Sequence, residues 1–355
     1  MIEGLDHFLE NSGQPGLPEL RELLAELMGR NGVERFIDHQ LLQAKGQRVL
    51  RVRFGSNGAI RSVVIKRLKP EIAKRNQLVA TRWLPAVGLG AAGPPLLGSV
   101  AARSGECVWH VYEDLGRWEL PARAPEREQL HAATELIARL HTGFAGHALL
   151  GEIRLHGGDL GIHFYESNVR DALAAMQALR PPPEHQGVCE RLLDRLSELQ
   201  ADVPRRAEAM GELAGPETLV HGDLWAINVF VSPAAGAAGS SNWQARLIDW
   251  DHAAVGPASY DLSTFLLRFP ANERHWILEL YRNAVSRSGW QLPADQDLNV
   301  LFETHEFARF ANRIIWPAIA LAVDGADWGW AELAEVESWF EQLAPVLSVP
   351  AKAGV

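Results

Sequence analysis

Apolar residues in the first part of the chain follow a helical period and then a strand period. Within residues 17–30, LPELRELLAELMGR, leucines recur three and four positions apart, which predicts a helix with one apolar face. The pattern then changes to runs rich in β-branched and apolar residues at 36–45, 48–54 and 61–68. Glycine-containing turns separate these runs, so we expect three consecutive strands.

One further helix and two further strands are expected before residue 113. Pro70 suits the first turn of a helix, where its missing N–H group costs nothing, and residues 71–86 continue in a helical pattern. Residues 95–101 and 107–112 are short runs of strand type. The N-terminal third is therefore predicted to be an antiparallel β-sheet lobe that carries one internal helix.

The rest of the chain is predicted to be mainly helical. A polar segment with glycine and two prolines, residues 113–126, connects the two parts. Helical patterns follow at 126–142, 166–178, 187–212, 273–288, 301–322 and 330–346, and short strands are expected near 218–220, 228–232 and 244–249. We therefore expect an α+β protein of two lobes, residues 1–113 and 114–355, with a small β insert in the larger helical lobe.

The composition narrows the class of protein. With 355 residues, 47% hydrophobic and 22% charged, the chain has the make-up of a soluble globular protein with more than one core. A net charge of -10 lacks the basic footprint of nucleic-acid binding. No apolar run reaches the ~18 residues of a membrane span, and the acidic N-terminus does not resemble a signal peptide. Two cysteines make no disulfide framework, so we expect a cytoplasmic location.

Polar residues interrupt an apolar run in the segment HGDLWAINVF (221–230). Burying polar groups is costly, so these residues either fix a turn or line a reaction site. Asp223 and Asn228 lie five positions apart, and Asp249 follows an apolar pair in the downstream segment LIDWDHAAVGPASYDLS. Upstream, Lys66 ends the otherwise apolar strand VVIK.

These residue types meet the demands of phosphoryl transfer from ATP to a hydroxyl group. The reaction needs a carboxylate for the hydroxyl proton, oxygen ligands for Mg²⁺, and a cation on the phosphates that are not transferred. Magnesium prefers carboxylate and amide oxygens and keeps several waters, so two protein ligands suffice. The chain offers Asp223 as the base, Asn228 and Asp249 as metal ligands, and Lys66 as the cation. The spacing D-x-x-x-x-N is that of the protein-kinase catalytic loop.

The two segments together resemble the aminoglycoside phosphotransferase and choline kinase superfamily, and the HGDLW form is also similar to fructosamine kinases. Members of this superfamily are small-molecule kinases. The resemblance therefore implies the bilobal protein-kinase-like fold, with ATP and Mg²⁺ as cofactors. It gives Asp223, Asn228, Asp249 and Lys66 the roles that their chemistry suggests.

The resemblance also implies roles for further residues. VYEDLG, which contains Glu113 and Leu115, resembles the hinge whose backbone hydrogen-bonds adenine. In the first hairpin, Gly46 is the residue that could let the backbone approach the phosphates. Asp261 would tie down the catalytic loop by hydrogen bonds, and His221 would likewise be structural.

One residue of the family pattern is missing. The family carries a glutamate on the helix of the first lobe, where it pairs with the lysine. The only acid of the predicted helix is Glu71, at a position where an acid stabilises the helix dipole in any case. The usual position of the glutamate falls at Asn76-Gln77. Three alternatives follow: Glu71 pairs with Lys66, an amide at Asn76 or Gln77 holds Lys66, or the pair is absent. Asp251 is a candidate supporting group or extra metal ligand, with a plain turn residue as the alternative.

We therefore expect an ATP- and Mg²⁺-dependent kinase, a monomer or homodimer, that phosphorylates a hydroxyl of an aminoglycoside, a choline-like alcohol or a sugar alcohol. The alternative is a nucleotide-binding pseudokinase or scaffold without turnover, which the missing helix acid and the lack of a glycine-rich loop favour. The complete set Asp223, Asn228 and Asp249 favours the enzyme. A protein kinase is disfavoured, because twelve residues from Asp249 to Asp261 leave no room for an activation loop.

Overall fold

A computed structural model of the protein describes residues 2–5, 14–29, 35–43, 48–56, 59–234 and 243–348. The chain divides into two compact units. The first comprises Met1–Leu120 and Ile227–Ala253, and the second comprises Pro121–Ala226 and Ala254–Val355. The first unit ends near the expected boundary at residue 113, but it also takes in a segment that the sequence pattern placed in the helical lobe.

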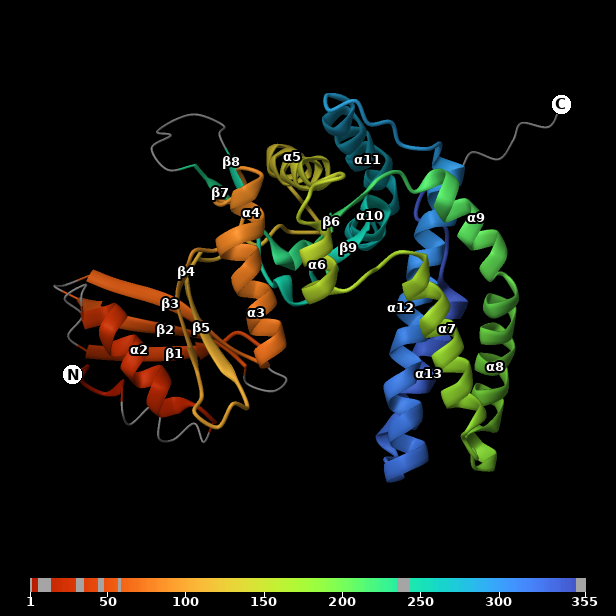
Figure 1. Cartoon of the computed structure of the whole chain (residues 1–355), viewed down its shortest axis with the longest axis horizontal. Coiled ribbons are helices and arrows are strands. Elements are labelled where there is room, and N and C mark those ends of the chain that lie inside the picture. The colour runs from red at the N-terminus through yellow and green to blue at the C-terminus, as the bar shows by residue number, and fades with distance from the viewer. Residues whose placement is uncertain are drawn as a thin grey trace. The chain divides into compact units, whose positions relative to one another are not determined.

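The first unit is built on a five-stranded antiparallel sheet with the strand order β1-β2-β3-β5-β4. Its strands are β1 (Arg35–Leu41), β2 (Val49–Ser56), β3 (Ala59–Leu68), β4 (Leu96–Ala101) and β5 (Val108–Glu113). The helix α2 (Leu17–Gly29) precedes them in the chain (Figure 1). The predicted N-terminal helix and antiparallel sheet are thus confirmed.

The two faces of this sheet have different surroundings. On β3, Val63 and Ile65 are buried in a cluster with the apolar face of α2. Successive side chains of a strand point to opposite faces. Val64 and Lys66 accordingly lie on the other face, where both line a pocket. One face therefore builds the core of the unit, and the other is available for a ligand.

The predicted internal helix runs from Pro70 to Ala86 but is not regular throughout. α3 (Pro70–Leu78) starts with the proline in its first turn. A π-helical stretch, Val79–Trp83, then leads into the short α4 (Leu84–Ala86). Widened turns of this kind are rare and often lie at functional sites. Here Val79 and Leu84 line the same pocket as Lys66.

A two-stranded hairpin completes the first unit. β7 (Val229–Pro233) pairs antiparallel with β8 (Trp243–Leu247). The N–H group of Leu247 donates to the carbonyl of Ala92, and the N–H group of Leu120 donates to the carbonyl of Val229. These backbone bonds explain why the segment groups with the sheet and not with the helices that flank it in the sequence.

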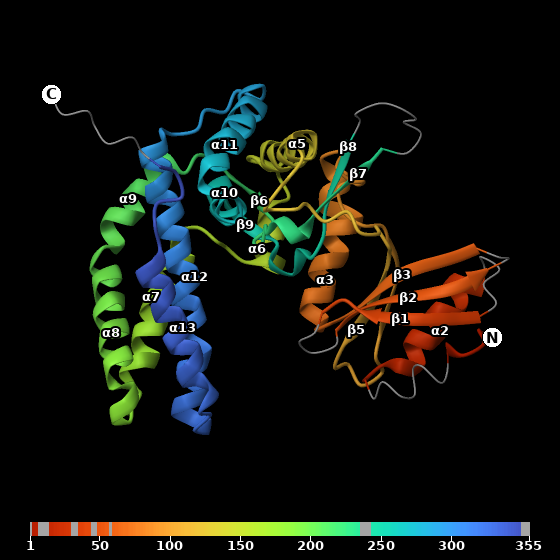
Figure 2. The same cartoon turned by 180° about the vertical axis from the view of Figure 1, so that it is seen from behind.

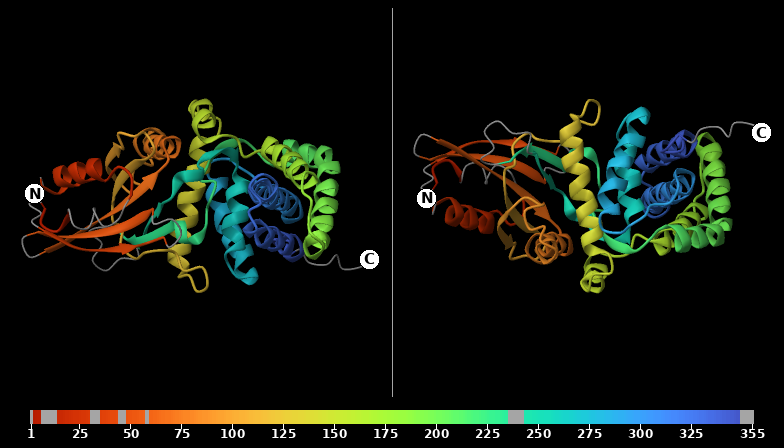
Figure 3. Two further views of the ribbon diagram at one scale, coloured as in Figure 1. Left: turned by 90° about the horizontal axis from the view of Figure 1, so that it is seen from below. Right: turned by 90° about the horizontal axis from the view of Figure 1, so that it is seen from above.

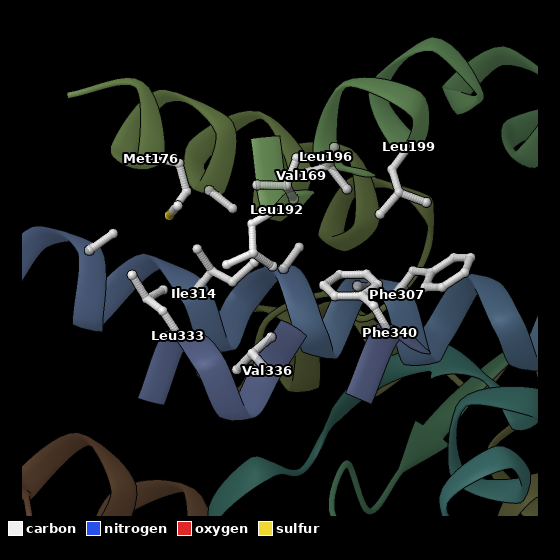
Figure 4. Packing of buried hydrophobic residues seen from close by; sticks show 14 of the residues in the cluster. Val169, Met176, Leu192, Leu196, Leu199, Phe307, Ile314, Leu333, Val336 and Phe340 are labelled. Atoms are coloured by element: carbon white, nitrogen blue, oxygen red, sulfur yellow. The ribbon is translucent and has the colours of Figure 1, made fainter. Parts of the chain in front are cut away.

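The second unit is mainly helical, as predicted. Its helices are α5 (Arg127–Phe144), α6 (Leu150–Gly157), α7 (Ile162–Gln177), α8 (Gln186–Ala201), α9 (Val203–Leu213), α10 (Ala258–Leu267), α11 (Ala271–Ser286), α12 (Asp295–Asp324) and α13 (Trp328–Gln342). β6 (Glu217–Val220) and β9 (Ala254–Pro257) pair antiparallel. α7, α8, α12 and α13 run side by side (Figure 2, Figure 3) around one apolar cluster. Val169, Leu196, Ile314 and Val336 meet in this core (Figure 4).

The second unit departs from the prediction in several elements. Residues 187–212 form two helices, because Pro204 cannot continue α8 and lies instead in the first turn of α9. α10 was not expected, because its polar residues are buried along with its apolar ones, and its sequence therefore does not alternate between a buried apolar and an exposed polar face. α6 and β9 are short and were also not expected. None of the helices in the described ranges is both long and apolar enough to cross a bilayer.

Candidate active site

The first unit contains a pocket of about 470 Å³. Apolar side chains from the sheet, the α3–α4 helix and the hairpin form much of its wall: Val49, Val64, Val79, Leu84, Tyr112, Leu115, Phe230 and Ile248. The polar side chains of Lys66, Asn76, Asn228 and Asp249 line it too. A largely apolar cavity of this size with a few polar groups is the usual form of a small-molecule site.

The ammonium group of Lys66 has two carboxylate partners. Nζ of Lys66 donates to Asp249, and it donates to Oδ1 of Asp251 at 2.7 Å. Burial by itself would lower the pKa of Lys66, but the two carboxylates outweigh burial and raise that pKa. Lys66 is therefore a cation at neutral pH, and it places a fixed positive charge in the pocket wall.

The hairpin brings the ends of two strands together at the pocket. Asn228 directly precedes β7, and Ile248, which follows β8, donates its N–H group to the carbonyl of Asn228 at 2.9 Å. The next residue, Asp249, has a left-handed backbone with a φ of 64°, the only such non-glycine residue in the described ranges. That conformation costs about 1–2 kcal/mol. Strain of this kind clusters at functional sites.

Asn228 and Asp249 have the donor atoms that a magnesium ion takes. Magnesium binds carboxylate and amide oxygens, keeps several waters, and uses phosphate oxygens of a substrate for the remaining positions. Asn228 is buried, whereas 41% of the Asp249 side chain is exposed, so the carboxylate is accessible from the pocket. Over the described residues, no group of three or more His, Cys, Asp or Glu could enclose a metal ion. The two residues fit an ion that is shared with a phosphate ligand.

Asp114 fixes the segment that follows β5. Its carboxylate accepts hydrogen bonds from Nε of Arg51 at 2.7 Å, from Oγ of Ser62 at 2.7 Å, and from the N–H group of Gly116 at 3.0 Å. Burial raises the pKa of Asp114, but these hydrogen bonds outweigh burial, and the pKa is lowered. The carboxylate therefore anchors this segment to β2 and β3.

Glu113 and Leu115, the two neighbours of Asp114, both line the pocket. The N–H group of Glu113 donates to the carbonyl of Pro95 and is thus occupied. For the backbone of Leu115, no hydrogen bond is found within the described part of the chain. Among the described residues, its N–H and carbonyl groups thus have no backbone partner. Gly46, the glycine expected near the phosphates, lies outside the described residues.

In the second unit, the buried carboxylate of Asp261 organises the loop after β6. It accepts hydrogen bonds from the N–H groups of His221 at 2.7 Å and Gly222 at 2.9 Å, and it lies 3.2 Å from Nε2 of His141. Burial raises the pKa of Asp261, but these partners outweigh burial, and the pKa is lowered. Gly222 has a φ of 82°, which glycine adopts without strain. This backbone requirement accounts for the glycine of HGD.

Asp223 lies half-buried on the same loop. Its N–H group is 3.4 Å from Nδ1 of His221, and its carbonyl accepts a hydrogen bond from the N–H group of Trp225 at 2.9 Å. The guanidinium of Arg268 lies 3.3 Å from the centroid of the Trp225 ring. Burial lowers the pKa of Arg268, and nearby carboxylates that include Asp223 counteract the effect. Asp223 thus shares its surroundings with a cation on an aromatic ring.

The structure distinguishes the three candidates for holding Lys66 from the helix. Glu71 is exposed in the first turn of α3, and the described contacts include no ion pair between it and Lys66. Gln77 is exposed as well. Asn76 is buried, and its Nδ2 donates to Oδ1 of Asp251 at 2.9 Å. The helix therefore reaches Lys66 through Asp251.

Sequence reasoning missed several residues of these sites, among them His141, Arg51 and Arg268. His141 stands among apolar residues of α5 in LIARLHTGF, and a buried polar residue in an apolar pattern is a usable signal. Arg51 is similar, because it interrupts the apolar strand β2 between two buried residues. Arg268 follows the last turn of α10 and carries no local signal.

Comparison with known proteins places the chain in a family. Residues 44–294 match the phosphotransferase enzyme family. No curated protein matches the chain. Solved structures with the same fold include a spectinomycin phosphotransferase in complex with ADP and spectinomycin, which is 14% identical, aligns over 93% of this chain and 95% of its own, and has a TM-score of 0.57.

Two more structures show the same fold. An ethanolamine kinase from Plasmodium vivax is 11% identical over 93% of this chain and 89% of its own, with a TM-score of 0.57. A choline/ethanolamine kinase family protein from Mesorhizobium loti is 16% identical over 94% of this chain and 95% of its own, with a TM-score of 0.54. The predicted fold class and the resemblance stated from the HGD-x-x-x-x-N and I-D-W motifs are thereby confirmed. The chain belongs to the phosphotransferase enzyme family and is a small-molecule kinase by that membership.

Proposed function

We propose that the protein transfers the γ-phosphoryl group of ATP to a hydroxyl group of a small molecule in a Mg²⁺-dependent reaction. The observation that carries the proposal is the ion pair of Lys66 and Asp249 in a nucleotide-sized pocket that Asn228 also lines. A cation, a carboxylate and an amide are the side chains that kinases use around the phosphates and their metal ion. A purely apolar ligand would gain nothing from this set.

The remaining wall of the pocket supports a purine base as the other half of the ligand. Val64, Leu84 and Ile248 present apolar surface suited to a flat ring. The N–H and carbonyl groups of Leu115 supply a donor and an acceptor for the edge of adenine. Asp114 holds this backbone in place through its bonds to β2 and β3. We assign Glu113 and Leu115 to adenine and Gly46 to the phosphates.

Asn228 and Asp249 are the proposed ligands of Mg²⁺, and Lys66 is the proposed contact of the phosphates that are not transferred. Bound Mg²⁺ would neutralise charge on the phosphate oxygens. Asp249 is more exposed than Asp251, at 41% against 22% of the side chain, so Asp249 is the carboxylate that a ligand can reach. Lys66 keeps a carboxylate partner when Asp249 turns to the ligand.

Asp223 is the proposed base. Its carboxylate accepts the proton of the acceptor hydroxyl while that oxygen forms a bond to the γ-phosphorus, and the bond from the γ-phosphorus to the ADP oxygen breaks. His221 and Asp261 support the loop, because Asp261 fixes two backbone N–H groups directly before Asp223. This support orients the carboxylate without taking part in the chemistry.

Several acids of α12 and α13 are already neutralised by arginines. Four of them form ion pairs in the second unit: Arg206 with Glu303, Arg309 with Glu306, Arg313 with Glu332, and Arg191 with Glu337. Paired acids offer little net charge to an amine. Aminoglycosides, choline-like alcohols and sugar alcohols therefore all stay within the proposal.

A panel assay tests this function. ATP consumption by the purified protein is measured with Mg²⁺ and each class of alcohol, and the product is identified by mass. We expect consumption that requires both Mg²⁺ and one class of acceptor. Binding of ADP without acceptor-dependent ATP consumption across the panel would instead support the nucleotide-binding scaffold.

A further inference from the structure

The acid that is missing from α3 has a replacement on another element. Asp251 lies in the short turn Trp250–His252 that follows β8 and Asp249. We propose that Asp251 is the positioning residue for Lys66, and that Asn76 and Arg75 fix Asp251 to α3. The proposal deepens the proposed function and rests on it, because that function gives Lys66 its role on the phosphates.

One oxygen atom carries the link between the strand and the helix. Oδ1 of Asp251 accepts from Nζ of Lys66 at 2.7 Å and from Nδ2 of Asn76 at 2.9 Å. Nδ2 of Asn76 also donates to the carbonyl of Ile72 at 3.0 Å, so the amide nitrogen faces the carboxylate. An amide N–H and an ammonium group are both donors and need an acceptor between them. Asp251 supplies that acceptor, which a glutamate on the helix would otherwise provide.

The backbone of Asp251 is held by the same helix. Arg75 directly precedes Asn76 on α3, and its Nη1 donates to the carbonyl of Asp251. The neighbouring Trp250 is buried, and its Nε1 donates to the carbonyl of Leu247 at 3.0 Å. The turn is therefore fixed to α3 on one side and to β8 on the other. A carboxylate on so well fixed a turn loses little conformational freedom when it binds Lys66.

The two carboxylate partners of Lys66 differ in access. Asp249 lines the pocket with 41% of its side chain exposed, whereas Asp251 has 22% exposed and is not part of the pocket wall. A metal ion in the pocket competes with Lys66 for Asp249, a phosphate group competes with Asp249 for Lys66, and either leaves Asp251 in place. Asp251 therefore sets the position of Lys66 when the pocket is filled, and Asp249 is the carboxylate that turns to the ligand.

Three variants test this assignment by titration with ADP in the absence of Mg²⁺ and acceptor. In Asp251→Asn, we expect ADP to bind about tenfold to hundredfold more weakly, since Lys66 loses a charge-assisted partner. Adding Asn76→Glu puts the acid back on the buried face of α3 and should recover most of this loss. Adding Gln77→Glu instead puts the same charge on the exposed neighbour and should recover none.

Either of two results would overturn the proposal. One is wild-type ADP affinity in Asp251→Asn. The other is a loss that Asn76→Glu does not recover while the melting temperature stays that of the wild type. These titrations measure binding and need no turnover. A protein that binds ADP but consumes no ATP would therefore refute the proposed kinase activity and leave this test of Asp251 intact.

A second measurement needs no nucleotide at all. In the ligand-free protein, the melting-temperature changes of Lys66→Met and Asp251→Asn should not add in the double variant, because each change removes the same interaction. Additive changes would contradict a direct Lys66–Asp251 pair. This result would hold even if the wild type did not bind ADP, because the test uses the ligand-free protein.

Discussion

The N–H group of His221 donates a 2.7 Å hydrogen bond to the fully buried carboxylate of Asp261, 40 residues further along the chain. Gly222 makes a second bond to the same carboxylate at 2.9 Å. The loop that carries Asp223 is thus fixed by its backbone. A single buried carboxylate from another element therefore fixes two consecutive N–H groups of the loop.

Replacing Asp261 should loosen this loop and destabilise the second unit. In Asp261→Asn, the buried backbone donors lose a charged acceptor, so we expect the free energy of unfolding to fall by about 2–4 kcal/mol. Turnover should fall more than ADP affinity, because ADP is assigned to the first unit. Chemical denaturation and steady-state kinetics measure both. Asp171→Asn, an exposed site on α7, is the control and should change stability by less than about 0.5 kcal/mol. Unchanged stability in Asp261→Asn would contradict this account.

Asp249 should carry the metal dependence of nucleotide binding. ATP is titrated calorimetrically into wild type and Asp249→Asn, with and without Mg²⁺. We expect Mg²⁺ to raise the ATP affinity of the wild type. In the variant this increase in affinity should be smaller by roughly tenfold or more, because a carboxylate is a far better Mg²⁺ ligand than an amide. Asp38→Asn, which removes an exposed acid from β1, should keep the gain. The assignment fails if both variants respond to Mg²⁺ alike.

Asp114 should affect the affinity for ATP and not the chemical step. In Asp114→Asn, the segment around Leu115 loses its charged anchor to Arg51, so we expect KM for ATP to rise by about threefold to tenfold with little change in kcat. Ser62→Ala removes one neutral donor of the same cluster and should have a smaller effect. A fall in kcat at unchanged KM would place Asp114 in the chemistry instead.

His110 should make stability depend on pH. This fully buried residue lies on β5 opposite Lys66, and burial followed by the charge of Lys66 lowers its pKa from 6.5 to about 4. Below pH 6.5 the unfolded chain therefore takes up a proton that the folded protein does not bind until about pH 4. The contribution of neutral His110 to the free energy of unfolding is complete above pH 6.5. It falls by roughly 3 kcal/mol as the pH drops to about 4.

The variant His110→Asn isolates this effect. Asparagine keeps a polar atom near Tyr112, whose hydroxyl lies 2.8 Å from Nδ1 of His110, but it does not titrate. Denaturation between pH 4 and pH 7 should show a shallower slope for the variant than for the wild type. Equal slopes would mean that other groups cause the pH dependence.

The sequence predicted the fold where a period was visible. The strands of the first sheet and the amphipathic α2, α5 and α12 show such periods, whereas α10 does not, because it is buried on almost every side. The grouping of the β7–β8 hairpin with the first unit was also beyond reach, since it depends on backbone bonds to Ala92 and Leu120. Backbone bonds leave no trace in residue type.

For the site, residue chemistry was visible in the sequence but pairing was not. Lys66 and Asp249 were expected from their types, and the structure pairs them. The partner of Asn76 could not be predicted, because the link through Asp251 joins residues 175 positions apart in the chain. Side chains that act through one another in this way have no common local pattern.

The role of Asp223 as the base is tested most directly by one pair of measurements on the variant Asp223→Asn. With the acceptor found in the panel assay, we predict that kcat falls by about a thousandfold or more, while ADP affinity from calorimetry stays within about twofold of the wild type. Asparagine keeps the shape of the side chain but cannot take up the proton. Turnover near that of the wild type in this variant would contradict the account.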